Sequence, residues 1–370
     1  MKGIAIRLLF ALWIIIVFSA CTMNVGLDEV QVDELEEQSQ VVDNQYEEPT
    51  AEADTSNEID NYEEEEEIIV QEPIDYKMEG INEIGDIMVV MYHGIKDNPP
   101  YHRSKEDFLR DLQYFYDNNY HLISMKDYLS QQIDVPLGKT PIVLTFDDGL
   151  SSTFALVGNK ADPESAIGIL EAFIEEHEDF GKAASLFIHA TKQNFQGDGT
   201  PLERLEWLVK NGYEIGNHSA THADLSQLSK DALIKEIGQV DYFLNELMPE
   251  YNMLAITYPY GKRPEASLIE HLADNQYEGV TFGYEIGFRE GPSSKMVPPS
   301  HTKFDPYNAP RVRGSEGEVQ DLWWFLDYYD NHADQRYISD GNPNTIVVPK
   351  EKVDLVNIDK VIDMELIVYE

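Results

Sequence analysis

The sequence predicts an α/β domain in which helices cover a parallel, barrel-like sheet. Continuous apolar runs at residues 87–92 and 142–146 are typical of strands that are buried on both faces. Segments with helical periodicity alternate with such runs, which is the pattern of parallel strands joined by crossover helices. The expected folded domain has a length of roughly 270 residues, which suits a barrel of this kind.

Each expected element follows from its local pattern. The expected strands span residues 87–92, 121–124, 142–146, 184–190 and 213–216. The expected helices span residues 108–116, 165–177, 202–209 and 228–247, and Ser229 is placed to cap the last of them. The segment 150–182 is long for a connection, which indicates a helical insertion beside the active cleft. A further helix with core aromatic side chains is indicated by Trp323, Trp324, Phe325 and Tyr328.

The first 20 residues have the features of a secretory signal peptide. Lys2 and Arg7 precede an apolar run at residues 8–18, which is too short to span a bilayer comfortably. Ser19-Ala20-Cys21 resembles a bacterial lipobox, so we expect residues 1–20 to be removed and Cys21, the only cysteine, to carry a lipid. An uncleaved N-terminal anchor is the alternative. The domain is therefore expected outside the cytoplasm, as a membrane-anchored lipoprotein or a secreted protein.

Residues 21–82 are expected to form a disordered acidic linker. They hold about 20 acidic residues against a single lysine, Lys77, and are too polar and self-repelling to fold. The formal net charge of the chain is -42, which argues against a nucleic-acid partner because like charge repels phosphate. The linker would hold a catalytic domain at residues 83–370 away from the membrane.

Acidic and imidazole side chains follow the predicted strands. Asp147 and Asp148 end the strand at 142–146, His93 ends the strand at 87–92, and His218 and His222 follow the strand at 213–216. Strand ends of a parallel sheet meet at one edge, so these side chains are expected to share one face. Two adjacent carboxylates are costly unless a cation neutralises them or one is protonated, although an Asp-Gly turn alone has an ordinary structural explanation. Together the residues suit one divalent metal with an open position for water.

At these motifs the sequence resembles the polysaccharide deacetylases, the carbohydrate esterase family with the NodB homology domain. The resemblance covers residues 84–315 and rests on Thr145-Phe146-Asp147-Asp148-Gly149 and His218-Ser219-Ala220-Thr221-His222. It implies a distorted (β/α) barrel of the NodB-homology type. It also implies that Asp148, His218 and His222 bind the metal and that Asp147 is the general base.

A third motif resembles the family's oxyanion motif, and one position beside it departs from the family pattern. Tyr258-Pro259-Tyr260-Gly261 resembles the family motif in which the backbone N–H at the position of Tyr260 stabilises the oxyanion. Many members carry an Arg three residues before that Tyr to orient the base, whereas this chain has Thr257. Arg311 resembles an Arg that some exopolysaccharide-type members carry near the end of the domain, and it is expected to substitute.

The general acid must also come from an unusual place. The family's C-terminal Leu-x-x-His motif is missing, because residues 340–370 contain no His. Met91-Tyr92-His93-Gly94 resembles a segment of the poly-N-acetylglucosamine deacetylases, which implies that His93 is the acid. A hydrogen-bonded structural His is the alternative. His189, at the end of an apolar strand, is expected in the core or in a supporting position.

The expected activity is removal of N-acetyl groups from an N-acetylhexosamine polymer, either an exopolysaccharide or peptidoglycan. Zinc suits the His and Asp ligands best, although cobalt, nickel or manganese could occupy the same site. Two alternatives stay open: an O-acetyl esterase of the xylan type, and a sugar-binding lipoprotein that keeps the fold without catalysis. The sequence leaves the oligomeric state open.

Overall fold

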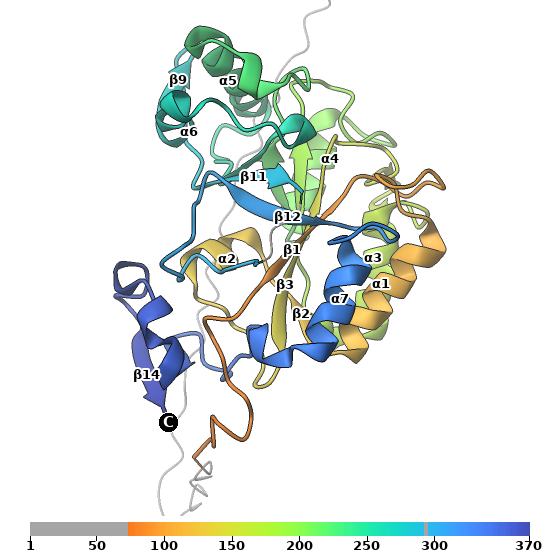
Figure 1. Cartoon of the computed structure of the whole chain (residues 1–370). Helices are drawn as coiled ribbons and strands as arrows, with labels where there is room; N and C mark the ends of the chain where they lie inside the picture. Colours follow the sequence, from red (N-terminus) through yellow and green to blue (C-terminus); the bar gives the residue numbers. More distant parts are fainter. Residues whose placement is uncertain (1–72, 292–294) are drawn as a thin grey trace, which may run out of the picture. The chain divides into compact units, whose positions relative to one another are not determined.

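The computed structural model describes residues 73–291 and 295–370, and its central feature is a closed barrel of seven parallel strands (Figure 1). The strands follow the order β1-β12-β11-β8-β7-β6-β3, and β3 pairs again with β1, which closes the ring. The barrel strands are β1 (Met88–Tyr92), β3 (Thr140–Phe146), β6 (Ser185–Ile188), β7 (Glu214–Asn217), β8 (Ala255–Thr257), β11 (Ile286–Glu290) and β12 (Ala309–Arg313). An eighth strand, β2 (Tyr120–Leu122), pairs with the start of β3. The predicted (β/α) barrel is confirmed.

Helices and small sheets complete the described part of the chain. Figure 1 shows α1, α3 and α7 on one side of the barrel. The helices are α1 (Lys105–Asp117), α2 (Met125–Ser130), α3 (Ala166–Glu176), α4 (Pro201–Lys210), α5 (Lys230–Leu247), α6 (Glu270–Ala273) and α7 (Leu322–Asn331). The paired short strands are β4 (Leu156–Val157) with β5 (Lys160–Ala161), β9 (Asn275–Tyr277) with β10 (Val280–Phe282), and β13 (Thr345–Pro349) with β14 (Glu365–Tyr369).

The elements expected between residues 87 and 247 are present, with ends shifted by up to three residues. Ser229 stands at the N-cap of α5, but its side chain makes no capping hydrogen bond. The segment 150–182 contains the β4–β5 hairpin before α3, so it is only partly helical. The sequence did not predict β11 and β12, because they are short and interrupt their apolar residues with Gly, Pro, Arg and Glu.

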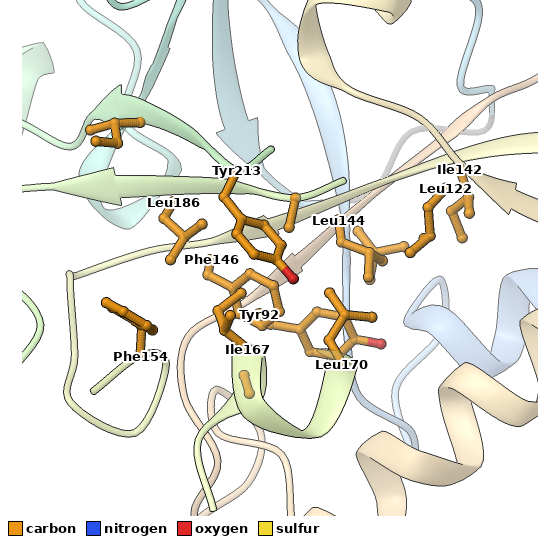
Figure 2. Packing of buried hydrophobic residues seen from close by; sticks show 14 of the residues in the cluster. Tyr92, Leu122, Ile142, Leu144, Phe146, Phe154, Ile167, Leu170, Leu186 and Tyr213 are labelled. Carbon is orange, nitrogen blue, oxygen red and sulfur yellow. The ribbon is translucent and has the colours of Figure 1, made fainter. Parts of the chain in front are cut away.

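The main hydrophobic core packs the barrel strands against α3 (Figure 2). Tyr92 at the end of β1 and Phe146 at the end of β3 stack with ring centroids 5.6 Å apart, and Ile167 and Leu170 of α3 belong to the same cluster. Burying one such side chain contributes about 1.5–3 kcal/mol. The core thus fixes the two strand ends that are followed directly by His93 and Asp147.

A buried carboxylate joins β1 to two helices. Asp111 of α1 accepts hydrogen bonds from Tyr92 Oη at 2.9 Å and from Trp323 Nε1 of α7 at 2.8 Å. Arg103 donates to the same carboxylate from Nε at 2.8 Å and from Nη2 at 2.7 Å. The buried charge is therefore paired and hydrogen-bonded, as burial requires. This network fastens the segment after His93 to the helical layer.

The folded part begins before the expected boundary at residue 83. Ile81 and Asn82 are buried, and Asn82 exchanges backbone hydrogen bonds with Ile338 and donates from Nδ2 to the carbonyl of Arg336 at 2.7 Å. The expected signal peptide at 1–20, Cys21 and most of the 21–82 linker lie outside the described residues. Among the helices that the structure does describe, none is both long and apolar enough to cross a membrane.

A second polar network supports the end of β7. Asn217 donates from Nδ2 to the carbonyl of Ile237 at 2.9 Å and to Asp241 Oδ2 at 3.1 Å. Tyr284 donates its hydroxyl to Asp241 Oδ2 at 2.5 Å. Burial raises the pKa of Asp241 to about 7, although these two hydrogen bonds act to lower it. Asp241 therefore takes up a proton in the folded chain at a pH where an exposed carboxyl is ionised.

Asp241→Asn should change how stability depends on pH. The folded pKa lies above the unfolded value, so the contribution of Asp241 to the free energy of unfolding falls as pH rises from about 4 to about 7. The amide keeps an acceptor for Tyr284 and cannot ionise. Relative to wild type, the variant should therefore gain on the order of 2–4 kcal/mol between pH 4 and pH 8, measured by urea unfolding.

The matched control is Asp231→Asn, which removes an exposed carboxyl from the same helix. Its free energy of unfolding should follow the wild-type pH dependence. If the free energy of unfolding of Asp241→Asn changed with pH as in wild type, the pKa of Asp241 would not be raised in the folded chain.

Candidate active site

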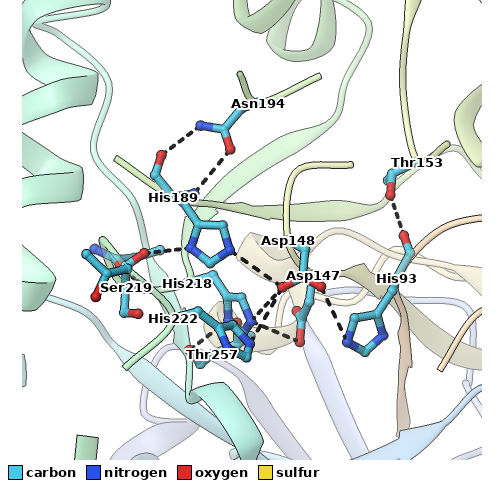
Figure 3. Close-up of polar contacts among 12 residues, drawn as sticks. His93, Asp147, Asp148, Thr153, His189, Asn194, His218, Ser219, His222 and Thr257 are labelled. Atoms are coloured by element: carbon cyan, nitrogen blue, oxygen red, sulfur yellow. Dashed lines mark hydrogen bonds and ion pairs between the residues drawn. The ribbon is translucent and has the colours of Figure 1, made fainter. Parts of the chain in front are cut away.

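Four strand ends of the barrel bring polar side chains together (Figure 3). His93 follows β1, Asp147 and Asp148 follow β3, His189 follows β6, and His218 follows β7. All these strands are parallel, so their carboxyl ends open on the same face of the barrel. From the sequence, we expected all of these residues except His189 to lie at this face as catalytic or metal-binding groups.

Asp148 lies at the centre of the cluster. Its Oδ1 faces Nε2 of His218 at 3.3 Å, Nε2 of His189 at 3.5 Å and Nε2 of His222 at 3.7 Å. Its Oδ2 faces Nε2 of His93 at 4.0 Å. Burial acts to raise the pKa of Asp148, but its interactions with the nearby His189 and His218 lower it well below its usual range. The carboxylate is therefore ionised and directed at imidazoles on both sides.

The spacing of these atoms fits a divalent metal. Two ligand atoms about 2.0–2.1 Å from a tetrahedral zinc lie about 3.3–3.4 Å apart, close to the observed separations. Ligand atoms of Asp148, His189 and His218 all lie within 4.8 Å of one another. Nε2 of His218 is buried and has no hydrogen-bond partner among the described residues. A buried nitrogen without a partner is costly, and a cation would remove that cost.

Thr257 fixes the orientation of His218. Nδ1 of His218 lies 2.6 Å from Thr257 Oγ1 and 3.1 Å from the Thr257 carbonyl oxygen. A carbonyl oxygen can only accept, so Nδ1 carries the proton and Nε2 presents its lone pair to Asp148. The residue that replaces the usual Arg of the family thus supports an expected metal ligand.

Arg311 holds Asp147 from a neighbouring strand. Its Nη1 donates to Asp147 Oδ1 at 2.8 Å and its Nη2 donates to Asp147 Oδ2 at 2.6 Å. Arg311 is 1% exposed and Asp147 is 2% exposed. Burial acts to raise the pKa of Asp147, but the charges of Arg311 and His218 outweigh it and lower the pKa to about 2. The structure brings Arg311 to the place where the sequence expected an orienting residue.

Left-handed backbone shapes the turns that carry the cluster. Asp148, Ser219, His222 and Tyr260 have φ of 74°, 64°, 58° and 58°, respectively. Such a conformation costs a non-glycine residue on the order of 1–2 kcal/mol and is concentrated at functional sites. His222 therefore approaches Asp148 through a turn after β7, and the His218–His222 spacing does not reflect one face of a helix.

Tyr260 lies beside the cluster in the short turn Pro259–Gly261. Its side chain is 63% exposed, and its ring meets the ring of His222 edge to face at a centroid distance of 4.5 Å. The side chain of the expected oxyanion residue therefore contacts the imidazole of His222.

His93 occupies the other side of Asp148. Its carbonyl oxygen accepts a hydrogen bond from Thr153, which anchors the strand end. Its Nδ1 is buried and lacks a hydrogen-bond partner among the described residues. Burial lowers the pKa of His93, while the charges of Asp147 and Asp148 oppose this shift. The ring is thus held next to the carboxylates without the hydrogen bond to Nδ1 that a structural His would make.

A groove with a volume of about 470 Å³ opens beside Asp148 and His189. Half of the residues that line it are polar and uncharged, among them Ser151, Thr191 and Gln193, and Lys96 adds a positive charge. Side chains of this type can hydrogen-bond hydroxyl and amide groups without a charge partner. The groove can therefore hydrogen-bond a polar ligand that reaches the cluster.

His189 was expected in the core or in a supporting position, and the structure places its Nε2 3.5 Å from Asp148 Oδ1, within the cluster. The available signal was its place at a strand end, level with His93, Asp147 and His218. Of the other expected site residues, only Cys21 lies outside the described residues.

Comparison with known proteins places this site in a family. Residues 134–280 match the family model "Polysaccharide deacetylase". Among solved structures, IcaB from Ammonifex degensii is 16% identical, with a TM-score of 0.48, covering 69% of this chain and 99% of that one. The deacetylase PplD from Streptococcus pyogenes is 17% identical, with a TM-score of 0.45, covering 66% of this chain and 98% of that one.

A polysaccharide deacetylase from Bacillus cereus, BC0361, is 18% identical, with a TM-score of 0.46, covering 66% of this chain and 69% of that one. These are distant likenesses. The family-model match covers both the Asp147–Asp148 turn and the His218–His222 turn, whereas His93 and Arg311 lie outside the matched segment. The segment 134–280 of this chain is therefore identified as a polysaccharide deacetylase domain.

Proposed function

We propose that this protein is a metal-dependent N-deacetylase that removes acetyl groups from an N-acetylhexosamine polymer at the cell surface. The observation that carries the proposal is the contrast between the two adjacent carboxylates. Asp147 is held by two hydrogen bonds from Arg311, with Nε2 of His218 at 4.0 Å, whereas Oδ1 of Asp148 faces the Nε2 atoms of His218 and His222 at 3.3 and 3.7 Å. This contrast supports Asp147 as the group that accepts a proton and Asp148 as the group that binds a cation.

Asp148, His218 and His222 would hold the metal, for which zinc fits the donor set best. When bound, the metal would supply Lewis acidity towards the acetyl carbonyl and water. Asp147 takes the proton of the attacking water, and Arg311 keeps Asp147 ionised and in a fixed orientation. The backbone N–H of Tyr260 would stabilise the oxyanion, a type of contact worth about 3–4 kcal/mol.

His93 would complete the reaction by protonating the leaving nitrogen. The carbon–oxygen bond to water forms, the amide carbon–nitrogen bond breaks, and the products are acetate and a free amino sugar. The lowered pKa of His93 makes its imidazolium a stronger acid, which favours proton donation once the ring is protonated.

The substrate assignment rests on the groove and on the N-terminal sequence. The Ser, Thr, Asn and Gln side chains of the groove next to His189 suit the hydroxyl and acetamido groups of a sugar. The signal-peptide pattern and Cys21 support a lipid-anchored position from which a long acidic tether would let the domain reach a surface polymer.

The direct test measures acetate release by the purified full chain after metal has been restored. We expect release from N-acetylglucosamine oligomers or from peptidoglycan. Acetylxylan is included because the same site could cleave acetyl esters, and preference for it would favour the esterase. Saccharide binding without release from any substrate, with metal bound, would contradict the proposal and favour a non-catalytic binding protein.

Two single substitutions should separate proton transfer from metal binding. Asp147→Asn should lower kcat by roughly 10²–10⁴-fold and leave metal affinity within a few-fold of wild type, because it removes only the base. His218→Ala should lower metal affinity and kcat together. Metal affinity is measured by calorimetry and kcat by acetate release.

Both variants need a check of folding, because Asp147→Asn leaves the buried Arg311 without its charge partner. Urea unfolding shows whether each variant is folded. If folded Asp147→Asn lost metal and folded His218→Ala kept it, the roles assigned to Asp147 and His218 would be wrong.

A further inference from the structure

His189 lies close to the same oxygen atom, Oδ1 of Asp148, as the expected metal ligands His218 and His222. Its Nε2 lies 3.5 Å from Asp148 Oδ1, between the distances of His218 at 3.3 Å and His222 at 3.7 Å. The ring centroid of His189 lies 5.2 Å from that of His218 and 5.7 Å from that of His222. Figure 3 shows the His189 ring pointing at Asp148. The three imidazoles thus converge on one carboxylate oxygen.

The His189 ring is oriented in the way that metal-binding imidazoles usually are. Its Nδ1 lies 2.8 Å from the carbonyl oxygen of Ser219, which can only accept, so Nδ1 carries a proton. In the neutral ring Nε2 is then left with a lone pair that points into the cluster. The backbone is also held, because Asn194 donates from Nδ2 to the His189 carbonyl at 2.7 Å and accepts from the His189 N–H at 3.3 Å.

Hydrogen bonding alone does not account for this arrangement. A carboxylate oxygen has two lone pairs, but three imidazole nitrogens lie within 3.7 Å of Oδ1 of Asp148. If the imidazoles were protonated to serve as donors, they would also repel one another at these ring separations. A single cation among the four side chains would satisfy Oδ1 and all three nitrogens at once.

We infer that His189 is a further metal ligand, so that the ion would be held by Asp148, His189, His218 and His222. The inference rests on the proposed metal-dependent function. Three imidazoles and one carboxylate favour zinc, cobalt or nickel over magnesium or manganese, which prefer oxygen ligands. With four protein ligands, a position for water requires a coordination number of five, which zinc can adopt.

The test compares metal binding by the metal-free full chain and by His189→Asn. The Asn amide can still donate to the Ser219 carbonyl as Nδ1 does, but it has no atom at the position of Nε2. We expect the affinity for Co²⁺ and Zn²⁺, measured by calorimetry, to fall by about 100-fold or more, beyond the effect of losing only a supporting group. X-ray absorption of the Co²⁺ protein should count one imidazole fewer than in wild type.

His332→Ala is the control, because it removes an exposed imidazole at the end of α7. Its metal affinity and imidazole count should equal those of wild type. His189→Ala serves as a second variant, and urea unfolding shows which variants are folded. Equal affinity and an unchanged imidazole count in folded His189→Asn and His189→Ala would overturn the inference while leaving the proposed function intact. A wild-type protein that bound no metal would overturn both.

Discussion

The buried ion pair between Arg311 and Asp147 is the interaction on which the site depends. Arg311 lies on β12 and Asp147 follows β3, and β1 pairs with both strands, so the side chains meet across β1. Arg311 also donates from Nη1 to Thr145 Oγ1 at 3.1 Å, and Thr145 donates to the carbonyl of Val90 at 2.8 Å. Removing one partner of a buried pair of this kind typically costs about 3–5 kcal/mol, because the other charge is left unpaired. The contact therefore links β12 to the end of β3 and keeps the proposed base ionised.

The neighbouring carboxylate has a different environment because the backbone turns between the two residues. Asp147 ends the strand, and its N–H donates to the carbonyl of Tyr92. Asp148 then adopts a left-handed φ of 74°, which carries its side chain away from Arg311 and towards the imidazoles. Strain at Asp148 and at His222 is stored locally, and the packed strands that hold both turns offset its cost. Two chemically identical side chains are thereby given opposite surroundings.

The sequence predicted most of the fold up to residue 247, because buried parallel strands and amphipathic helices leave strong periodic signals. It did not predict β11 and β12, since the apolar pattern of these strands is broken by residues such as Arg311 that serve the site. The boundary at residue 83 was placed too late, because the burial of Asn82 depends on hydrogen bonds to residues more than 250 positions away. The site residues next to strand ends could be named from motif and position, whereas their distances and partners depend on the closed barrel.

His189 shows why position carries more information than residue type at such a site. A lone His at the end of an apolar strand is ordinarily explained by core packing, and nothing in its immediate sequence argues otherwise. Its orientation depends on the Ser219 carbonyl, which is supplied by the turn that also carries His218 and His222. That turn has left-handed backbone at Ser219, so the carbonyl that aligns His189 and the approach of His222 come from the same local strain. The turn after β7 thus carries His218 and His222 and aligns His189, while Thr257 orients the His218 ring, and a substitution that relaxed the turn would disturb His189 and His222 together.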